Sequence, residues 1–193
     1  SFFYSSFIGP FPSSLKRSIP CKKFFLDVDA MSIITDDIVV GSLTDAHNIH
    51  ALNELGITHI LNLTAHGENK YPESFIYHRI APQSESQDEQ LSNYFPEASD
   101  FIHHVEHIGG RVLVHCFNGM SRSNAVVLHY LIDRHELYLR LIFQHLMNCR
   151  PSAEVTPNLK VQLAIFEYER LGKSSVQRHS GKDWDFYEWN KIK

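Results

Sequence analysis

The chain has 193 residues, a length that fits one domain with short extensions at its ends. With 43% hydrophobic and 21% charged residues, it has enough apolar side chains for a sizeable core. The net charge of -4 gives no reason to expect nucleic acid or an anionic membrane as partner, and no apolar run reaches the roughly 18 residues that span a bilayer.

Three regions are expected: an irregular leader over residues 1–24, a folded block over 25–171 and a polar tail over 172–193. The leader has no basic segment ahead of its apolar residues, so it does not match a signal peptide. The three cysteines are too few and too scattered for a disulfide framework. This cysteine usage favours the cytoplasm or the nucleus.

Strand and helix signals alternate through the folded block. In chain order, the patterns predict a strand at 38–40, a helix at 44–55, strands at 57–63 and 75–80, a helix at 92–108, a strand at 111–115, and helices at 123–132, 137–147 and 158–171. Thr44 or Asp45 is expected to cap the first helix, and Ser92 the second. The alternation favours an α/β domain with helices on both faces of a sheet.

The segment after the strand at 111–115 is polar and contains glycine, although apolar elements precede and follow it. Ligands of such sheets bind at the carboxyl ends of strands, which is where Cys116 lies. Gly119 permits a backbone angle that other residues resist, and the following helix presents its positive end. The backbone N–H groups expected to form an anion-binding nest belong to Phe117, Asn118, Gly119, Met120, Ser121 and Arg122.

This arrangement suits the chemistry of phosphate monoesters. A helix N-terminus and nearby cations favour a thiolate, so Cys116 is expected to attack phosphorus directly. The planar fork of Arg122 fits two phosphate oxygens. Ser123 can donate a hydrogen bond to the sulfur and so make it a better leaving group, and His115 can orient the loop through its ring nitrogens.

The stretch Val112–Ser123 resembles the signature of the dual-specificity protein phosphatases, a branch of the cysteine-based protein tyrosine phosphatases. The similarity extends to Val39–Ser42, Leu52–Asn62 and Tyr94–Glu97, and to Pro157-Asn158 in the last helix. In all it covers residues 27–171. The pattern is most similar to the small atypical members and to the mitogen-activated protein (MAP) kinase phosphatases.

The resemblance implies a central mixed sheet of about five strands with helices on both faces. It also implies hydrolysis of phosphotyrosine and phosphoserine/threonine in proteins through a cysteinyl-phosphate intermediate, with no metal or other cofactor. The implied partner is a phosphorylated protein, such as a MAP kinase or a related signalling protein.

The family places an aspartic acid upstream of the cysteine as general acid for the leaving oxygen. Counting back without gaps puts Glu85 in its place, and Asp88 follows three residues later with the usual side chain. Either carboxyl group can protonate a leaving group if it comes within reach. Slow turnover is therefore expected on alkyl phosphoesters, which need the acid most.

Other functions are open to the same sequence. A phosphoprotein-binding or scaffolding module would keep the anion nest without an effective acid. A phosphoinositide phosphatase usually carries lysine beside the cysteine, and Phe117, Asn118 and Met120 supply no charge. The histidine pairs 103/107 and 47/50 lack the accompanying glutamate of a zinc protease helix, so no metal site is expected.

Overall fold

The computed structural model describes residues 31–81 and 88–176, with side chains for all of these except residues 88–90. Five strands, six α-helices and one 3-10 helix make up this part of the chain: β1 Ser32–Ile33, β2 Ile38–Gly41, α1 Leu43–Ala46, α2 Ile49–Glu54, β3 His59–Asn62, β4 Ile76–Arg79, η1 Asp88–Tyr94, α3 Phe95–His107, β5 Val112–His115, α4 Arg122–His135, α5 Leu139–Cys149 and α6 Pro157–Leu171. Their alternation confirms the predicted α/β class.

The five strands form one sheet in the order β1-β2-β5-β3-β4. The central strand β5 pairs in parallel with both neighbours, so that Val114 lies opposite Val40 of β2 and Leu61 of β3. β4 is parallel to β3, whereas β1 runs antiparallel to β2, so the sheet is mixed as expected. Because β2, β5 and β3 are parallel, their carboxyl ends meet at one edge of the sheet.

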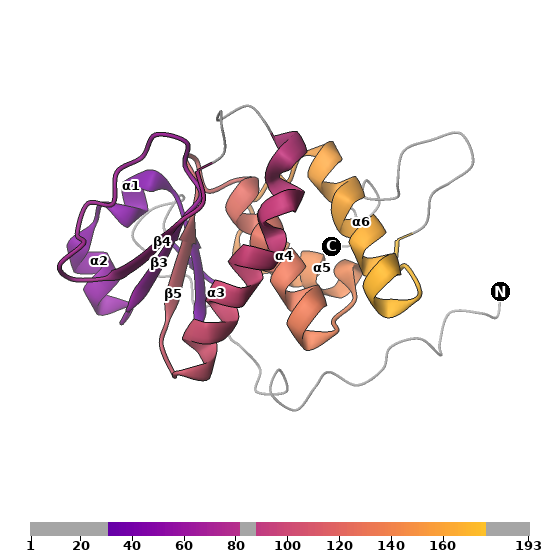
Figure 1. Ribbon diagram of the computed structural model, residues 1–193, viewed down its shortest axis with the longest axis horizontal. Coiled ribbons are helices and arrows are strands. Elements are labelled where there is room, and N and C mark those ends of the chain that lie inside the picture. The colour runs from indigo at the N-terminus through magenta and orange to yellow at the C-terminus, as the bar shows by residue number, and fades with distance from the viewer. Residues whose placement is uncertain (1–30, 82–87, 177–193) are drawn as a thin grey trace.

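Helices cover both faces of this sheet: α1 and α2 lie on one side, and α3 to α6 lie on the other (Figure 1). Leu113 of β5 belongs to the core under α1 and α2, whereas Val112 and Val114 belong to the core under the four longer helices. Both faces of β5 are therefore buried, which explains its run of apolar residues from Val112 to Val114. Across the described ranges, no helix combines the length and apolar character needed to cross a membrane.

The first predicted helix is two short helices, and its predicted cap is wrong. Ser42, not Thr44 or Asp45, caps α1: its Oγ accepts the N–H of Asp45 at 3.2 Å, and the Asp45 carboxylate accepts the N–H of Ser42 at 2.7 Å. In this reciprocal capping box Asp45 serves as the third helical residue. Asn48 then caps α2 by accepting the N–H of Ala51 at 3.2 Å.

Ser92, the predicted cap of the second helix, lies inside η1 instead. The helix α3 begins only at Phe95, with Pro96 in its first turn. A proline is favoured there because the first turn has no partner for its N–H group. The expected apolar face is correct, since the side chains on it are buried: Phe95, Ala98, Ile102 and Val105.

Candidate active site

Residues 116–121, here called the 116–121 loop, connect β5 to α4 at the carboxyl edge of the sheet. Gly119 has a φ of 69°, in the left-handed region. A Cβ atom at this position would lie 2.7 Å from the carbonyl oxygen of Gly41, the last residue of β2. Only glycine meets both the backbone angle and this close approach, so the end of β2 fixes the path of the loop.

Cys116 begins the loop and is 5% exposed. Its Sγ lies 3.5 Å from the Oγ of Ser123, a fully buried residue in the first turn of α4. The fold therefore brings together the predicted nucleophile and the hydroxyl expected to hydrogen-bond its sulfur.

The N-terminus of α4 faces the same loop. Arg122 is the first helical residue and is buried. The N-cap residue Ser121 makes no capping hydrogen bond with its side chain, and its Oγ accepts the N–H of Thr156 at 3.2 Å instead. The first N–H groups of a 14-residue helix thus lack a side-chain cap, which suits binding of an anion.

Two side chains outside the predicted set of site residues hold the loop from the protein side. Arg150, at the end of α5, donates from Nε to the carbonyl oxygen of Gly119 at 2.8 Å. Asn124 donates from Nδ2 to the carbonyl oxygens of Gly119 and Met120, at 3.1 and 2.5 Å. Both side chains are buried. For Asn124 a signal was available, since it is a polar residue in an apolar helix; for Arg150 there was none.

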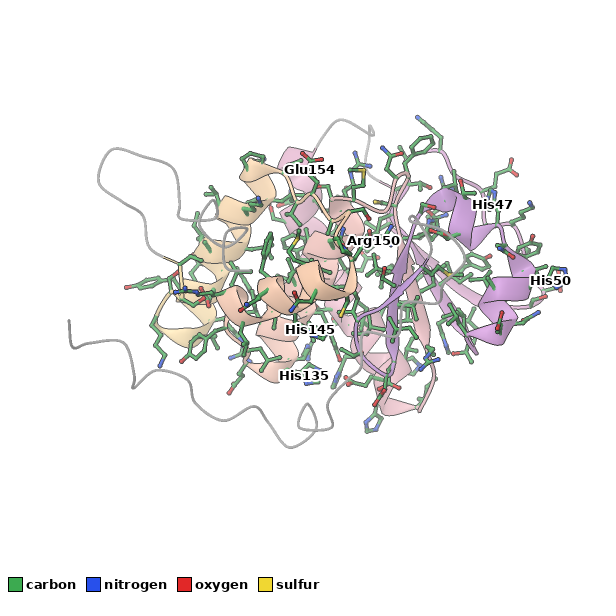
Figure 2. All side chains as sticks on the ribbon, turned by 180° about the vertical axis from the view of Figure 1, so that it is seen from behind. His47, His50, His135, His145, Arg150 and Glu154 are labelled. Carbon is green, nitrogen blue, oxygen red and sulfur yellow. The ribbon has the colours of Figure 1, made fainter. Side chains whose placement is uncertain are left out.

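Two backbone groups make contacts of the same kind. The N–H of Leu43, in α1, donates to the carbonyl oxygen of Phe117 at 3.0 Å, and the N–H of Glu154 donates to that of Met120 at 2.8 Å. Figure 2 shows Glu154 and Arg150 on the α5–α6 side of the sheet, opposite α1. The loop is therefore held from both sides.

These bonds determine the direction of the peptide groups in the loop. In a planar trans peptide the N–H points away from the carbonyl oxygen. Since the carbonyl groups of residues 117, 119 and 120 point outward to the protein, the N–H groups of Asn118, Met120 and Ser121 point inward. The loop thus forms a nest of donors beside Cys116, which is suited to the oxygens of a tetrahedral anion.

His115, the last residue of β5, lies directly under the loop and is 1% exposed. Burial lowers the pKa of its imidazole to about 4; the nearby backbone of Cys116 opposes this shift, and His47 adds to it. The ring is therefore neutral at pH 7, and its Nδ1 has no hydrogen-bond partner among the described residues. The role of His115 in orienting the loop stays a prediction.

The two candidate general acids are Glu85 and Asp88. Glu85 lies outside the described residues. Asp88 is the first residue of η1, and its side chain is outside the described ones. The assignment of either residue as general acid stays a prediction.

Within the described ranges, no three His, Cys, Asp or Glu side chains are grouped as a metal site needs. The rings of His103 and His107 form a pair with centroids 6.4 Å apart. His47 and His50 lie at the α1–α2 end of the molecule (Figure 2).

Comparison with known proteins identifies the family. Residues 38–170 match the family described as the catalytic domain of dual specificity phosphatases. The chain is 34% identical over 154 residues to dual specificity protein phosphatase 1 of Arabidopsis thaliana, covering 80% of this chain and 77% of that protein. It is 40% identical over 150 residues to dual specificity protein phosphatase PHS1 of the same plant, covering 76% of this chain but 16% of that longer protein. The crystal structure of human DUSP28 superimposes with a TM-score of 0.68 at 26% identity, covering 74% of this chain and 95% of that one.

The chain therefore belongs to the dual specificity phosphatases, within the cysteine-based protein tyrosine phosphatase superfamily. It is a protein phosphatase, a hydrolase of phosphoric monoesters. The 116–121 loop and the residues that hold it all lie inside the matched range.

Proposed function

We propose that this protein hydrolyses phosphotyrosine and phosphoserine/threonine in protein substrates, with Cys116 as nucleophile and Arg122 as phosphate-binding side chain. One observation carries the proposal. The carbonyl groups of residues 117, 119 and 120 point away from the centre of the 116–121 loop, to hydrogen-bond donors of the protein. The N–H groups that follow them point to the centre of the loop, between a buried thiol and the N-terminus of α4. A phosphate dianion is the reactive group that needs these donors and this nucleophile together.

In the first step, Cys116 Sγ bonds to phosphorus and the phosphorus–oxygen ester bond breaks. The leaving oxygen takes a proton from Glu85 or Asp88. In the second step, water attacks phosphorus and gives a proton back to the same carboxylate, the phosphorus–sulfur bond breaks, inorganic phosphate leaves, and the sulfur becomes a thiolate again. Ser123, 3.5 Å from the sulfur, stabilises that thiolate by donating a hydrogen bond. This route uses no metal and no other cofactor.

The test is turnover of p-nitrophenyl phosphate by the full chain and by Cys116→Ser. We expect vanadate-sensitive turnover by the wild type and none by the variant. The alternative is a phosphoprotein-binding or scaffolding module that keeps the donor nest but turns over poorly. Wild-type activity indistinguishable from that of Cys116→Ser would favour this alternative and reject the enzymatic mechanism.

The substrates proposed are phosphorylated signalling proteins, a MAP kinase or a relative among them, in the cytoplasm or the nucleus. Cys116→Ser keeps the donor nest without the nucleophile, so it should retain bound substrate. Phosphoproteins recovered with this variant, but not in the presence of vanadate, would identify the substrate class.

A further inference from the structure

A cleft of about 1100 Å³ lies beside the 116–121 loop. Helices α1 and α2 with their adjoining residues form one wall, and Phe117, Asn118 and Met120 of the loop form another, together with Ser152. We call it the flanking cleft. Its volume exceeds what a single phosphate group needs, and suits several amino-acid side chains.

The flanking cleft is attached to the donor nest by short backbone contacts. Leu43, which lines the cleft, donates its N–H to the carbonyl oxygen of Phe117 at 3.0 Å. On the opposite side, the N–H of Glu154 donates to the carbonyl oxygen of Met120 at 2.8 Å and so ties the segment that contains Ser152 to the loop. A substrate whose phosphate sits in the nest therefore meets this cleft with the residues next to its phosphorylated side chain.

Part of the surface beside the loop is apolar. Phe117 is 55% exposed, and the half-buried Leu43 and Met120 line the cleft with it. An exposed aromatic next to the nest gives a flat surface for an apolar side chain of the substrate.

On the wall formed by α1 and α2, the flanking cleft carries carboxylates. Asp45 and Glu54 line it together with His47 and His50, and among the described residues that line it there is no lysine or arginine. The Asp45 carboxylate is held in place by the N–H and Oγ of Ser42, at 2.7 and 2.8 Å. A second phosphate group or an acidic side chain would meet like charge there, whereas lysine or arginine would meet the opposite charge.

We infer that the flanking cleft binds the polypeptide next to the phosphorylated residue and selects apolar and basic side chains over acidic or phosphorylated ones. This inference rests on the proposed function and narrows its substrates. The flanking cleft would favour singly phosphorylated segments with basic flanking residues over multiply phosphorylated segments and over inositol phosphates.

The test uses phosphotyrosine peptides that differ only in a Leu-Lys or Leu-Glu pair, placed before or after the phosphotyrosine. The measured quantity is kcat/KM on each peptide divided by kcat/KM on p-nitrophenyl phosphate, which fills only the nest. For the wild type, a Leu-Lys peptide should exceed its Leu-Glu counterpart by about three- to ten-fold at low salt, and by less at high salt. Glu54→Lys should remove or reverse this preference.

Glu169→Lys is the matched control, because Glu169 is exposed on α6, outside the cleft, and the change in net charge is the same. The inference is overturned if the wild type prefers the Leu-Glu peptides or a doubly phosphorylated peptide. It is equally overturned if Glu54→Lys and Glu169→Lys behave alike, as they would if another part of this chain or a second copy filled the cleft. Absence of turnover on p-nitrophenyl phosphate would instead reject the proposed function, so the two failures are distinguishable.

Discussion

At the scale of single residues, proton donation to the leaving oxygen rests on Glu85 or Asp88. Glu85→Gln and Asp88→Asn each remove one candidate proton donor with little change in size. We expect Glu85→Gln to lower kcat on phosphoserine peptides about a hundredfold, as loss of a general acid does, and Asp88→Asn to have little effect. Aryl phosphates with good leaving groups should be affected less. If neither substitution slows phosphopeptide hydrolysis, the acid lies elsewhere.

Asn124 is a positioning residue, since its amide holds the carbonyl groups of Gly119 and Met120. Asn124→Ala should let these peptide groups rotate, weaken inhibition by inorganic phosphate and lower kcat/KM about tenfold. Asn124→Asp should be worse, because a carboxylate would face two carbonyl oxygens.

Ser99→Ala is the control for Asn124→Ala. It removes a buried hydrogen bond to His129, 2.9 Å away, in another part of the core. It should reduce the free energy of unfolding by a similar amount, about 1–2 kcal/mol, without changing inhibition by phosphate. Equal effects of the two variants on phosphate inhibition would show that Asn124 acts only through stability.

At the scale of elements, the junction of β2 with the 116–121 loop can be tested through Gly119. Gly119 and Gly109 have the same φ of 69°, but a Cβ at Gly109 would have nothing within 4 Å, whereas one at Gly119 would meet Gly41. Gly109→Ala should therefore cost only the backbone strain, about 1 kcal/mol of unfolding free energy, and leave kcat/KM unchanged. Gly119→Ala should cost more and lower kcat/KM at least about tenfold, because the loop must move. Denaturant unfolding and steady-state kinetics on both variants check this, and equal behaviour would contradict it.

The elements also show which features a sequence can predict. The strand ending at His115, the loop after it and the helix from Arg122 follow from a local change between apolar and polar residues. The split between α1 and α2 was missed because several residues in this region could act as caps. Ser42 is the cap of α1 because the Asp45 carboxylate reaches its N–H, and Asn48 caps a second helix. β1 has only two residues, too few for a pattern. The contact of Arg150 with Gly119 joins residues 31 apart and depends on how α5 packs, so no local rule predicts it.

At the scale of the whole molecule, His129 of α4 packs against two other helices. Its ring lies between Phe95 of α3 and Phe166 of α6, with centroids 4.6 and 4.0 Å away. Burial lowers the pKa of this imidazole to about 4, while Asp133 opposes the shift and Arg134 adds to it. Between pH 6.5 and about 4 the unfolded chain therefore binds a proton at this residue that the folded chain does not.

The stability contributed by neutral His129 should be fully present above pH 6.5 and should fall by up to about 3 kcal/mol as the pH drops towards 4. His129→Phe keeps an aromatic ring without the titration. Its free energy of unfolding should therefore fall less steeply between pH 7 and 5 than that of the wild type. His115, which also has a pKa of about 4, accounts for part of the remaining slope. Parallel curves for the two proteins would show that His129 does not contribute.

The outward carbonyl groups of the 116–121 loop link ligand binding to folding. Folding supplies partners for these acceptors, whereas an oxyanion in the nest supplies partners for the inward donors. An oxyanion that binds only the folded chain, at a hundred times its Kd, adds about 2.7 kcal/mol to the free energy of unfolding. Inorganic phosphate, the product of the proposed reaction, would then protect the enzyme against heat and proteolysis under the same conditions in which it slows turnover.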